Sequence, residues 1–421
     1  MKEKIEEEKD KTKVEDQKDS LKIIKENSNK LIIKENGKKI DSFEILSKGK
    51  EFPHINDDFE DLSFKLIYEN DSLLKHLIKH VNEFLDKNSD NKNSKIIESL
   101  SNFINYNGFS ENIINNILLN GIPEDLPCLR PLIWKVFLGL YESDELEDWK
   151  DISTSKFWEY KKIVEKYNYY PNDIKNEKDK LLLVQINKDL PRTRFDVPFF
   201  EKKNKNNDKE TNYDVLRRIL FFYAKEQNEI GYVQGMNEII AIIFYIFSKD
   251  DNPFCNEYLE SDSYFSLVNL LEEIKSIFAM DNIHYSQLFV TQQIKEIKKI
   301  LKKVEPELSN YFEEVGLELD NIVMRWILVL FAQEFSIDIA VNFWDRLFTQ
   351  KNKMKFICYI SAAIIKNNKE KIMTMNAGEI MEWSQEFKNK MNNLDINALV
   401  QTSIEIQIKY NKKDLNNLII K

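Results

Sequence analysis

The sequence contains little glycine and little proline, 9 of each among 421 residues. An all-β sandwich, barrel or propeller needs a tight turn after every short strand, and these two residues form many of those turns. Their scarcity argues against such folds and favours long helices. We therefore predict an all-α protein.

Cysteine is also scarce: Cys128, Cys255 and Cys358 are the only three, they lie far apart, and they form no CxxC pair. Such a set does not build the even disulfide framework of a small secreted domain. A reducing compartment is the better interpretation, and we expect a cytoplasmic protein.

Long apolar runs are missing. The longest, Ile239 to Phe247 and Ile357 to Ile365, hold about nine residues each, whereas a membrane-spanning helix needs about 20. The first 20 residues contain 14 charged side chains, which excludes the apolar core of a secretory signal. Any membrane association is expected to be indirect, through a partner.

Basic surplus and common catalytic signatures are absent too. The 61 Lys and Arg face 71 Asp and Glu, a net charge of −10, whereas nucleic-acid binders are normally basic, so we expect no nucleic-acid partner. No P-loop, GxGxxG, GxSxG or kinase signature occurs. His76 and His80 lie four positions apart, but without HExxH or a nearby cysteine they predict ordinary histidines and no metal site.

Composition divides the chain into four segments. Residues 1–55 form a charged tail, in whose first 30 residues nine Lys face nine Asp or Glu; few apolar side chains offset the entropy of ordering, so we predict disorder. Residues 56–110 are predicted to be a helical extension. Residues 111–370 are predicted to form a large helical domain, with residues 371–421 forming C-terminal helices packed on it.

Three local patterns refine this division. The polar run 201–212 predicts a solvated loop. Thr211 and Asp214 fit a capping box, which predicts a helix start. Met236 to Phe247 is rich in isoleucine and could be a buried strand, but its length favours a buried helix. No repeat of fixed period is present, which argues against a helical-repeat scaffold.

Two short loops carry residues suited to chemistry, and the first contains Asp189, Pro191 and Arg192. Pro191 lacks a backbone donor and biases Leu190 toward extended geometry, so we predict a loop. An arginine braced by an acid is well suited to phosphate oxygens, because its guanidinium is always charged and offers planar donors. An ordinary salt bridge between Asp189 and Arg192 is the alternative, favoured by this segment alone.

The second loop holds Gly231, Tyr232, Gln234 and Gly235, just before the long apolar segment. The glycines permit tight turning and close approach of another backbone. A glutamine amide both donates and accepts, which suits the positioning of a water molecule. The alternative is a helix-entry turn in which Gln234 is only a polar residue near the cap.

Together the two loops resemble the TBC-domain family of Rab GTPase-activating proteins. The family motifs IxxDxxRT and YxQG are matched in full by Ile186, Asp189, Arg192 and Thr193 and by Tyr232, Gln234 and Gly235. Further matches are Gly121-Ile122-Pro123 followed by Arg130 and Trp134, then Arg325-Trp326, and the WDxLF segment from Trp344 to Phe348. The string YVQGMNEI, with Tyr223-Ala224-Lys225 before it, is most similar to the member 13 branch.

The resemblance implies that residues 111–370 are an all-α TBC domain that accelerates GTP hydrolysis by a Rab-family small GTPase in its GTP-bound state, in membrane traffic. It implies that Arg192 and Gln234 are catalytic fingers supplied in trans. Asp189, Thr193, Tyr232, Gly235 and Arg130 would support the finger loops. It implies no cofactor of this chain's own, because GTP and Mg²⁺ belong to the partner. Localisation would be cytoplasmic, peripheral at endomembranes through the Rab.

Some alternatives stay open. Arg194 follows Thr193 where relatives often have Phe-Pro, so a second arginine lies close, although the motif register selects Arg192. Arg130 and Trp134 could instead be a core tryptophan with an arginine packed over it, the favoured interpretation. The same reasoning makes Arg325, Trp326 and Trp344 structural. A catalytically weak Rab-binding scaffold or effector is the alternative function, against which the intact pair of fingers argues.

Overall fold

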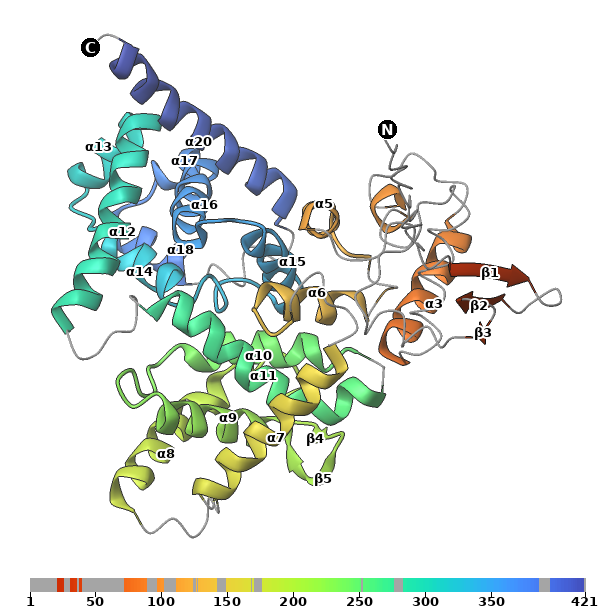
Figure 1. Ribbon diagram of the computed structural model, residues 1–421. Helices are drawn as coiled ribbons and strands as arrows, with labels where there is room; N and C mark the ends of the chain where they lie inside the picture. Colours follow the sequence, from red (N-terminus) through yellow and green to blue (C-terminus); the bar gives the residue numbers. More distant parts are fainter. Residues whose placement is uncertain are drawn as a thin grey trace, which may run out of the picture. The chain divides into compact units, whose positions relative to one another are not determined.

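The structure is a computed structural model of the 421-residue chain (Figure 1). It describes residues 21–25, 31–35, 38–39, 72–88, 97–101, 111–123, 126, 128–141, 149–167, 169, 176–250, 253–275, 283–385 and 394–419. The chain divides into two compact units, residues 1–72 with 105–107 and residues 73–104 with 108–421. The second unit contains every residue that the sequence nominated for a functional site.

The first unit holds a small antiparallel sheet of strands β1 (Leu21–Lys25), β2 (Leu31–Glu35) and β3 (Lys38–Lys39). Ile23 pairs with Ile33 and Ile24 with Ile32, and β-branched residues favour strands. This sheet differs from the disordered tail that the charge count of residues 1–55 predicts. A count of charges does not detect such short pairs of isoleucines. The other residues of 1–55 lie outside the described residues, and for them disorder stays a prediction.

The second unit is built from helices, which confirms the predicted all-α class. Its described helices are α3 (Ser72–Lys87), α5 (Glu111–Asn120), α6 (Leu129–Phe137), α7 (Trp149–Tyr167), α8 (Glu177–Asp189), the 3-10 turn η2 (Leu190–Arg192), α9 (Asn212–Glu226), α10 (Met236–Phe247), α11 (Pro253–Glu273), α12 (Ile283–Val304), α13 (Pro306–Glu314), α14 (Asp320–Leu328), α15 (Ile337–Phe348), α16 (Lys353–Asn367), α17 (Lys369–Ile372), α18 (Ala377–Gln385) and α20 (Ile396–Ile419). Among the described residues, no helix is both long and apolar enough to cross a membrane.

Helix α10 lies at the centre of the core. Every side chain from Met236 to Phe244 is buried, and the helix packs against α6, α9, α11 and α15. A helix covered on all sides is apolar all round, which explains why this segment lacks helical periodicity. The sequence interpretation that favoured a buried helix over a buried strand is correct.

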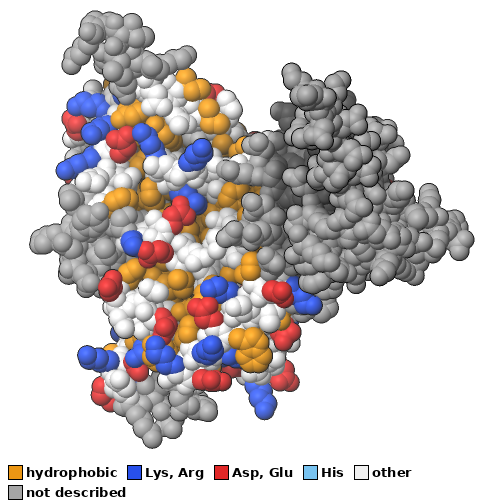
Figure 2. Space-filling view, viewed as in Figure 1, with side chains coloured by type: hydrophobic (Ala, Val, Ile, Leu, Met, Phe, Trp, Pro, Cys, Tyr) orange, Lys and Arg blue, Asp and Glu red, His pale blue; other side chains and the backbone are white. Residues whose placement is uncertain are grey.

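The last helices of the chain pack on earlier ones. Helix α18 contacts α14, and α20 contacts α12, α15 and α16; α20 runs across the helices coloured turquoise to blue in Figure 1. On the face seen in Figure 2, basic and acidic side chains are interspersed with apolar ones over these helices. The local mixture of charges there follows the near balance of the whole composition.

The sequence predicts that the polar run 201–212 is a solvated loop. In the structure this run contains a short β-hairpin. Strand β4 (Lys203–Asn204) pairs with β5 (Asn207–Thr211). The Asn204 side chain is buried, accepts from the Asn206 amide at 2.8 Å and contacts Asn212. Asparagine stabilises turns in this way, but without alternating apolar residues the hairpin was not recognisable. The predicted capping box of Thr211 and Asp214 is present at the start of α9.

Candidate functional site

The arginine loop begins where α8 ends. Helix α8 closes at Asp189 and continues into the 3-10 turn η2, which ends at Arg192. Leu190 is helical and not extended as predicted, because its amide still donates to the Ile186 carbonyl and outweighs the bias that Pro191 imposes. The tight turn leaves the Arg192 side chain 66% exposed.

The carboxylate of Asp189 orients the side chain of Arg192. The Nη2 atom of Arg192 lies 2.5 Å from Oδ1 of the buried Asp189, and its Nε donates to the Lys188 carbonyl at 3.2 Å. A guanidinium has five N–H donors. Three of the Arg192 donors therefore remain directed away from these two contacts, so the side chain is oriented and still able to bind an anion.

The glutamine loop connects to α10 through Gly235, whose φ is 109°. A Cβ atom here would lie 2.8 Å from Cγ1 of Val329. The glycine is thus required by its backbone conformation and by the close approach of the chain's own segment after α14. It holds Gln234, the residue before it, exposed at the start of the helix.

A ring of hydrogen bonds joins the two loops. The Tyr232 hydroxyl donates to Oδ2 of Asp189 at 2.8 Å, and Oδ1 of Asn237 accepts from Tyr232 at 3.2 Å and from the Gly235 amide at 2.9 Å. The Asn237 amide then donates to Oγ1 of Thr193 at 2.8 Å, and Thr193 donates to the Asp189 carbonyl at 3.0 Å. The structure thus brings Asp189, Thr193, Tyr232 and Gly235 together in one network.

Asn237 is the member of this network that sequence reasoning missed. It is buried and bridges both loops, and the available signal was a polar pair, Asn237 and Glu238, in the first turn of a helix that is apolar after them. Burial, and then the hydrogen bond to Asp189, raises the pKa of Tyr232 well above its ordinary value. Its hydroxyl, which is protonated at neutral pH even without this shift, remains a donor to Asp189.

Arg192 and Gln234 line the same pocket, although they lie 42 positions apart in the sequence (234 − 192). This finger pocket has a volume of about 360 Å³. Its lining comes from both loops and from the end of α14: Asp189, Arg192, Gln234, Gly235, Asn237, Glu238, Arg325, Leu328, Val329 and Gln333. The structure thus brings together the two residues that the motifs nominated as fingers.

Arg325 also lines the finger pocket, although we had interpreted it as purely structural. Its Nε and Nη2 atoms donate to the two carboxylate oxygens of the buried Glu334 at 2.5 and 2.8 Å. The hydrogen bonds to Glu334, more than the opposing effect of burial, raise the pKa of Arg325. The positive charge of Arg325 is therefore largely paired with Glu334 inside the protein.

Arg194 is buried, in contrast to Arg192 two positions earlier. Its backbone has a φ of 47°, in the left-handed region. Its guanidinium donates to the Phe335 carbonyl at 2.7 Å and to the Ala332 carbonyl, and its Nε lies 3.5 Å from Glu238. Burial lowers the pKa of Arg194, and Glu238 opposes that effect. This arginine ties the arginine loop to the segment after α14 and cannot reach a partner.

Arg130 does not contact the finger loops, contrary to the role that the resemblance implied. Its guanidinium lies 3.2 Å from Asp345, whose Oδ1 also accepts from the indole of the buried Trp134 at 2.8 Å. It also lines a pocket with Ile246, in the last turn of α10, roughly 16 Å along that helix from Gly235. The alternative interpretation, an arginine packed over a core tryptophan, describes this geometry.

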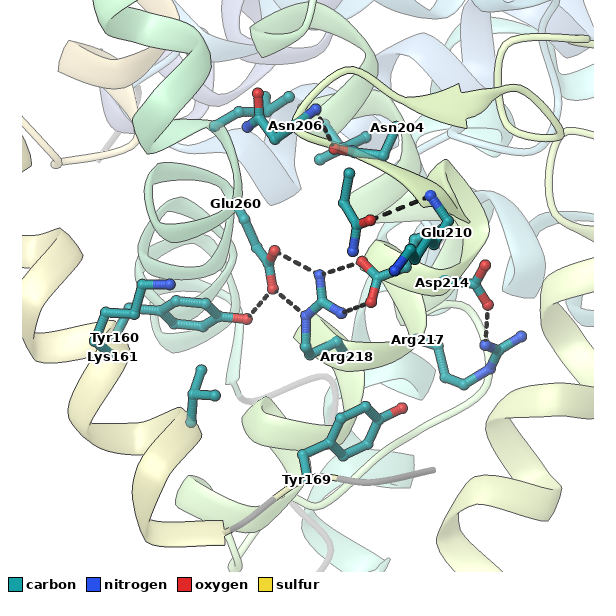
Figure 3. A pocket seen from close by; sticks show the side chains of 15 residues that line it. Tyr160, Lys161, Tyr169, Asn204, Asn206, Glu210, Asp214, Arg217, Arg218 and Glu260 are labelled. Atoms are coloured by element: carbon teal, nitrogen blue, oxygen red, sulfur yellow. Dashed lines mark hydrogen bonds and ion pairs between the residues drawn. The ribbon is translucent and has the colours of Figure 1, made fainter. Parts of the chain in front are cut away.

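A second pocket, of about 610 Å³, lies between the β4–β5 hairpin and helices α7, α9 and α11 (Figure 3). In this hairpin pocket Arg218 lies between Glu210 and Glu260, and the Tyr160 hydroxyl donates to Glu260 at 2.6 Å. None of the finger residues lines it. Its central charges are paired with one another.

Helix α3 carries the pair of histidines that lie four positions apart. The side chain of His76 lies outside the described residues, and His80 lies 4.0 Å from Glu83. Within the described part of the chain, no three His, Cys, Asp or Glu side chains come together as a metal-binding group would require.

Comparison with known proteins identifies the fold. In the crystal structure of the Ypt/Rab-GAP domain of Gyp1p, the whole chain superimposes on 75% of this one with a TM-score of 0.63 and 22% sequence identity. A second solved structure, the Chlamydomonas flagellar RabGAP TBC domain, has a TM-score of 0.50 and 16% identity and covers 84% of this chain and 96% of its own.

Curated sequences give the same result. TBC1 domain family member 13 of Homo sapiens is 32% identical over 164 residues, which is 39% of this chain and 41% of the human protein. The GTPase-activating protein GYP1 of Saccharomyces cerevisiae is 25% identical over 282 residues, 62% of this chain and 41% of the yeast protein. The matches thus span about two fifths of the length of these relatives.

The family itself is shown by a family model described as the Rab-GTPase-TBC domain, which matches residues 127–373. That range includes both finger loops, the finger pocket and the central helix α10. The resemblance predicted from the motifs, including the likeness to member 13, is confirmed. The chain belongs to the Rab-GTPase-TBC domain family.

Proposed function

We propose that this protein is a GTPase-activating protein for a Rab-family small GTPase in its GTP-bound state, and that it contributes Arg192 and Gln234 to the reaction. One observation carries the proposal. These two side chains are exposed and line the same pocket, and the loops that carry them are joined by one network of hydrogen bonds. A protein that only bound the GTPase would not need this arrangement.

Arg192 acts on the transferring phosphoryl group. Asp189 fixes the direction of its guanidinium, and the remaining N–H donors bind the phosphate oxygens as negative charge develops there. An arginine finger of this kind accelerates hydrolysis by about 10³ to 10⁵, or roughly 4 to 7 kcal/mol of the barrier. GTP and Mg²⁺ enter with the partner, so this chain needs no cofactor.

Gln234 orients the attacking water. Its amide both donates and accepts, and the bond from the Gly235 amide to Asn237 fixes the backbone beside it. This role is usually held by a glutamine of the GTPase itself. In this proposal, the residue from the TBC domain replaces it.

The site of action follows from the partner. Rab GTPases operate in membrane traffic, so we place this protein in the cytoplasm and, through the Rab alone, at endomembranes. The charge balance and the absence of a basic surplus agree with an acidic protein that does not bind nucleic acid.

The test is single-turnover GTP hydrolysis by a panel of Rab GTPases, with and without the full chain. We expect acceleration for at least one Rab, and its loss in Arg192→Ala. Lys209→Ala serves as the control and should keep kcat, because this exposed cation lies on β5 and does not line the finger pocket. If Rabs bind the protein but none hydrolyses GTP faster, the protein is a scaffold or effector and the proposed activity is wrong.

A further inference from the structure

Phe195 is 72% exposed and lies three positions after Arg192. A single exposed apolar side chain needs no explanation on its own. Phe195, however, follows Arg194, whose guanidinium is buried in the core. The backbone of Phe195 is therefore held in place by its neighbour. The question is why an aromatic ring is presented to solvent beside the arginine loop.

The turn that carries Phe195 is held from three sides. The Val197 amide donates to the Arg194 carbonyl at 2.8 Å and closes the turn. The Tyr213 hydroxyl donates to the Thr193 carbonyl at 2.6 Å, and Arg194 is bonded to the segment after α14. An aromatic ring on such a turn loses little conformational entropy when a partner covers it.

A second exposed apolar side chain lies on α14, whose C-terminal part lines the finger pocket. Met324 is 44% exposed on α14. It precedes Arg325 and lies one turn before Leu328, and both of these residues line the finger pocket. Because residues four apart share a helix face, Met324 extends the apolar surface of Leu328 along α14 away from the pocket.

The size of a protein interface decides whether a partner at the fingers can avoid these side chains. A stable interface covers about 800 Å² on each partner, which as a circular patch has a radius of about 16 Å. Three residues of chain span at most about 11 Å. A GTPase that receives Arg192 near the centre of its contact area therefore reaches Phe195, and one that enters the finger pocket lies one helical turn of α14 from Met324.

We propose that Phe195 and Met324 are contact residues for the same GTPase, and that they set its affinity and help to select it. The inference rests on the proposed function. The surface they contact on the partner is apolar and borders its nucleotide site. Arg192 and Gln234 determine the rate of the bound complex, and these two side chains determine how readily the complex forms.

The experiment compares Phe195→Ala and Met324→Ala with Trp158→Ala as matched control. Trp158 is 60% exposed on α7 and lines neither the finger pocket nor the hairpin pocket. For a Rab that the full-length protein accelerates, kcat and KM are measured separately, together with the Kd for the Rab loaded with a non-hydrolysable GTP analogue. Circular dichroism confirms that each variant is folded.

We expect Phe195→Ala to raise Kd and KM about tenfold or more, with kcat nearly unchanged, and Met324→Ala to act the same way but less. Trp158→Ala should match the wild type. If Phe195→Ala and Met324→Ala both keep the wild-type Kd, or if Trp158→Ala raises it equally, the inference is wrong. If the wild type binds a Rab without accelerating it, the proposed function fails while the ratio of Kd values still decides this inference. If it binds no Rab, both fail.

Discussion

The finger pocket and the hairpin pocket both hold arginines against carboxylates, but they leave different numbers of donors for a partner. Arg218, in the hairpin pocket, makes four hydrogen bonds to Glu210 and Glu260, between 2.6 and 3.1 Å, and its side chain is 17% exposed. Arg192 bonds one carboxylate and one carbonyl and is 66% exposed. The same residue type is structural in one place and available in the other.

The surroundings of Arg218 explain the difference. Burial by itself lowers the pKa of Arg218, but its hydrogen bonds to Glu260 and then Glu210 outweigh that effect and raise it. The ion pairs of Arg218 thus connect the hairpin, α9 and α11, and they leave few guanidinium donors for a ligand. A large polar pocket is therefore a weaker indication of function than a small one whose donors are unused.

The difference between the two pockets is tested most directly by substituting the proposed fingers. Arg192→Lys has the largest expected effect. Lysine keeps the charge but lacks the planar fork, so we expect a loss of about 10³ to 10⁵ in stimulated hydrolysis. The melting temperature should stay unchanged because the side chain is mostly exposed. Stopped-flow phosphate release measures the rate, and an active lysine variant would show that a point charge suffices.

Gln234→Ala is expected to have the next largest effect, a loss of about 10² to 10³ in kcat. The measurement is a crossed set, with wild-type and glutamine-deficient Rab each tested against wild-type and Gln234→Ala protein. The Rab substitution should leave much of the stimulated rate intact. If the Rab glutamine is indispensable and Gln234 is not, then Gln234 is only a helix-entry residue.

Arg218→Met tests the other side of the comparison. It leaves Glu210 and Glu260 close together without their cation, so we expect a loss of about 2 to 3 kcal/mol in the free energy of unfolding, somewhat less than for a fully buried pair. Stimulated hydrolysis should be unchanged at low temperature. Urea denaturation measures the loss against Lys209→Met, an exposed control from the same hairpin. A normal stability would mean that the triad is not what fixes the hairpin.

Asn237→Asp tests the link between the two finger loops. An aspartate cannot donate to Thr193 and adds a charge near Asp189, so we expect a loss of about 1 to 3 kcal/mol in stability. The loss of kcat should exceed any change in KM, because both fingers lose alignment. Asn207→Asp, at an exposed position on β5, is a control for added charge. Wild-type kcat in the Asn237 variant would show that the ring does not position the fingers.

The smallest effect is expected at the capping box of α9. Burial pushes the pKa of Asp214 upward, but its hydrogen bonds from Thr211 and its contact with Arg217 lower it below the ordinary value. The unfolded chain then takes up its proton at a higher pH than the folded chain, so the stabilisation is present above about pH 4 and lost as pH falls through the folded pKa.

We therefore expect Asp214→Ala to cost about 1 kcal/mol at pH 7, and the difference from the wild type to shrink at lower pH. Urea denaturation at several pH values measures it, with the exposed Asp208→Ala as reference. A difference that grows toward acid would contradict the sign of this linkage.

Much of the site was predictable because its signals are local. Asp189, Arg192, Thr193, Tyr232, Gln234 and Gly235 were found from two short motifs, and the capping box from residues three apart. What the sequence did not reveal depends on distant partners. Arg130 bonds Asp345, 215 positions away, and Asn237 bridges to Thr193 over 44 positions. The hairpin at 203–211 was missed because asparagine side chains, and not alternating apolar residues, stabilise its turn.

The sequence by itself determined that this chain is helical, that its longest apolar segment is a buried helix, and that two loops carry an arginine and a glutamine. The motif register selected Arg192, but the local sequence offered no physical reason why this arginine and not Arg194 is exposed. Arg192 and Arg194 have the same side chain, and local propensity cannot separate them. Tertiary structure decided, because carbonyls of Ala332 and Phe335, 138 and 141 positions away, bind Arg194 in the core, whereas Arg192 bonds only its own turn and stays at the surface.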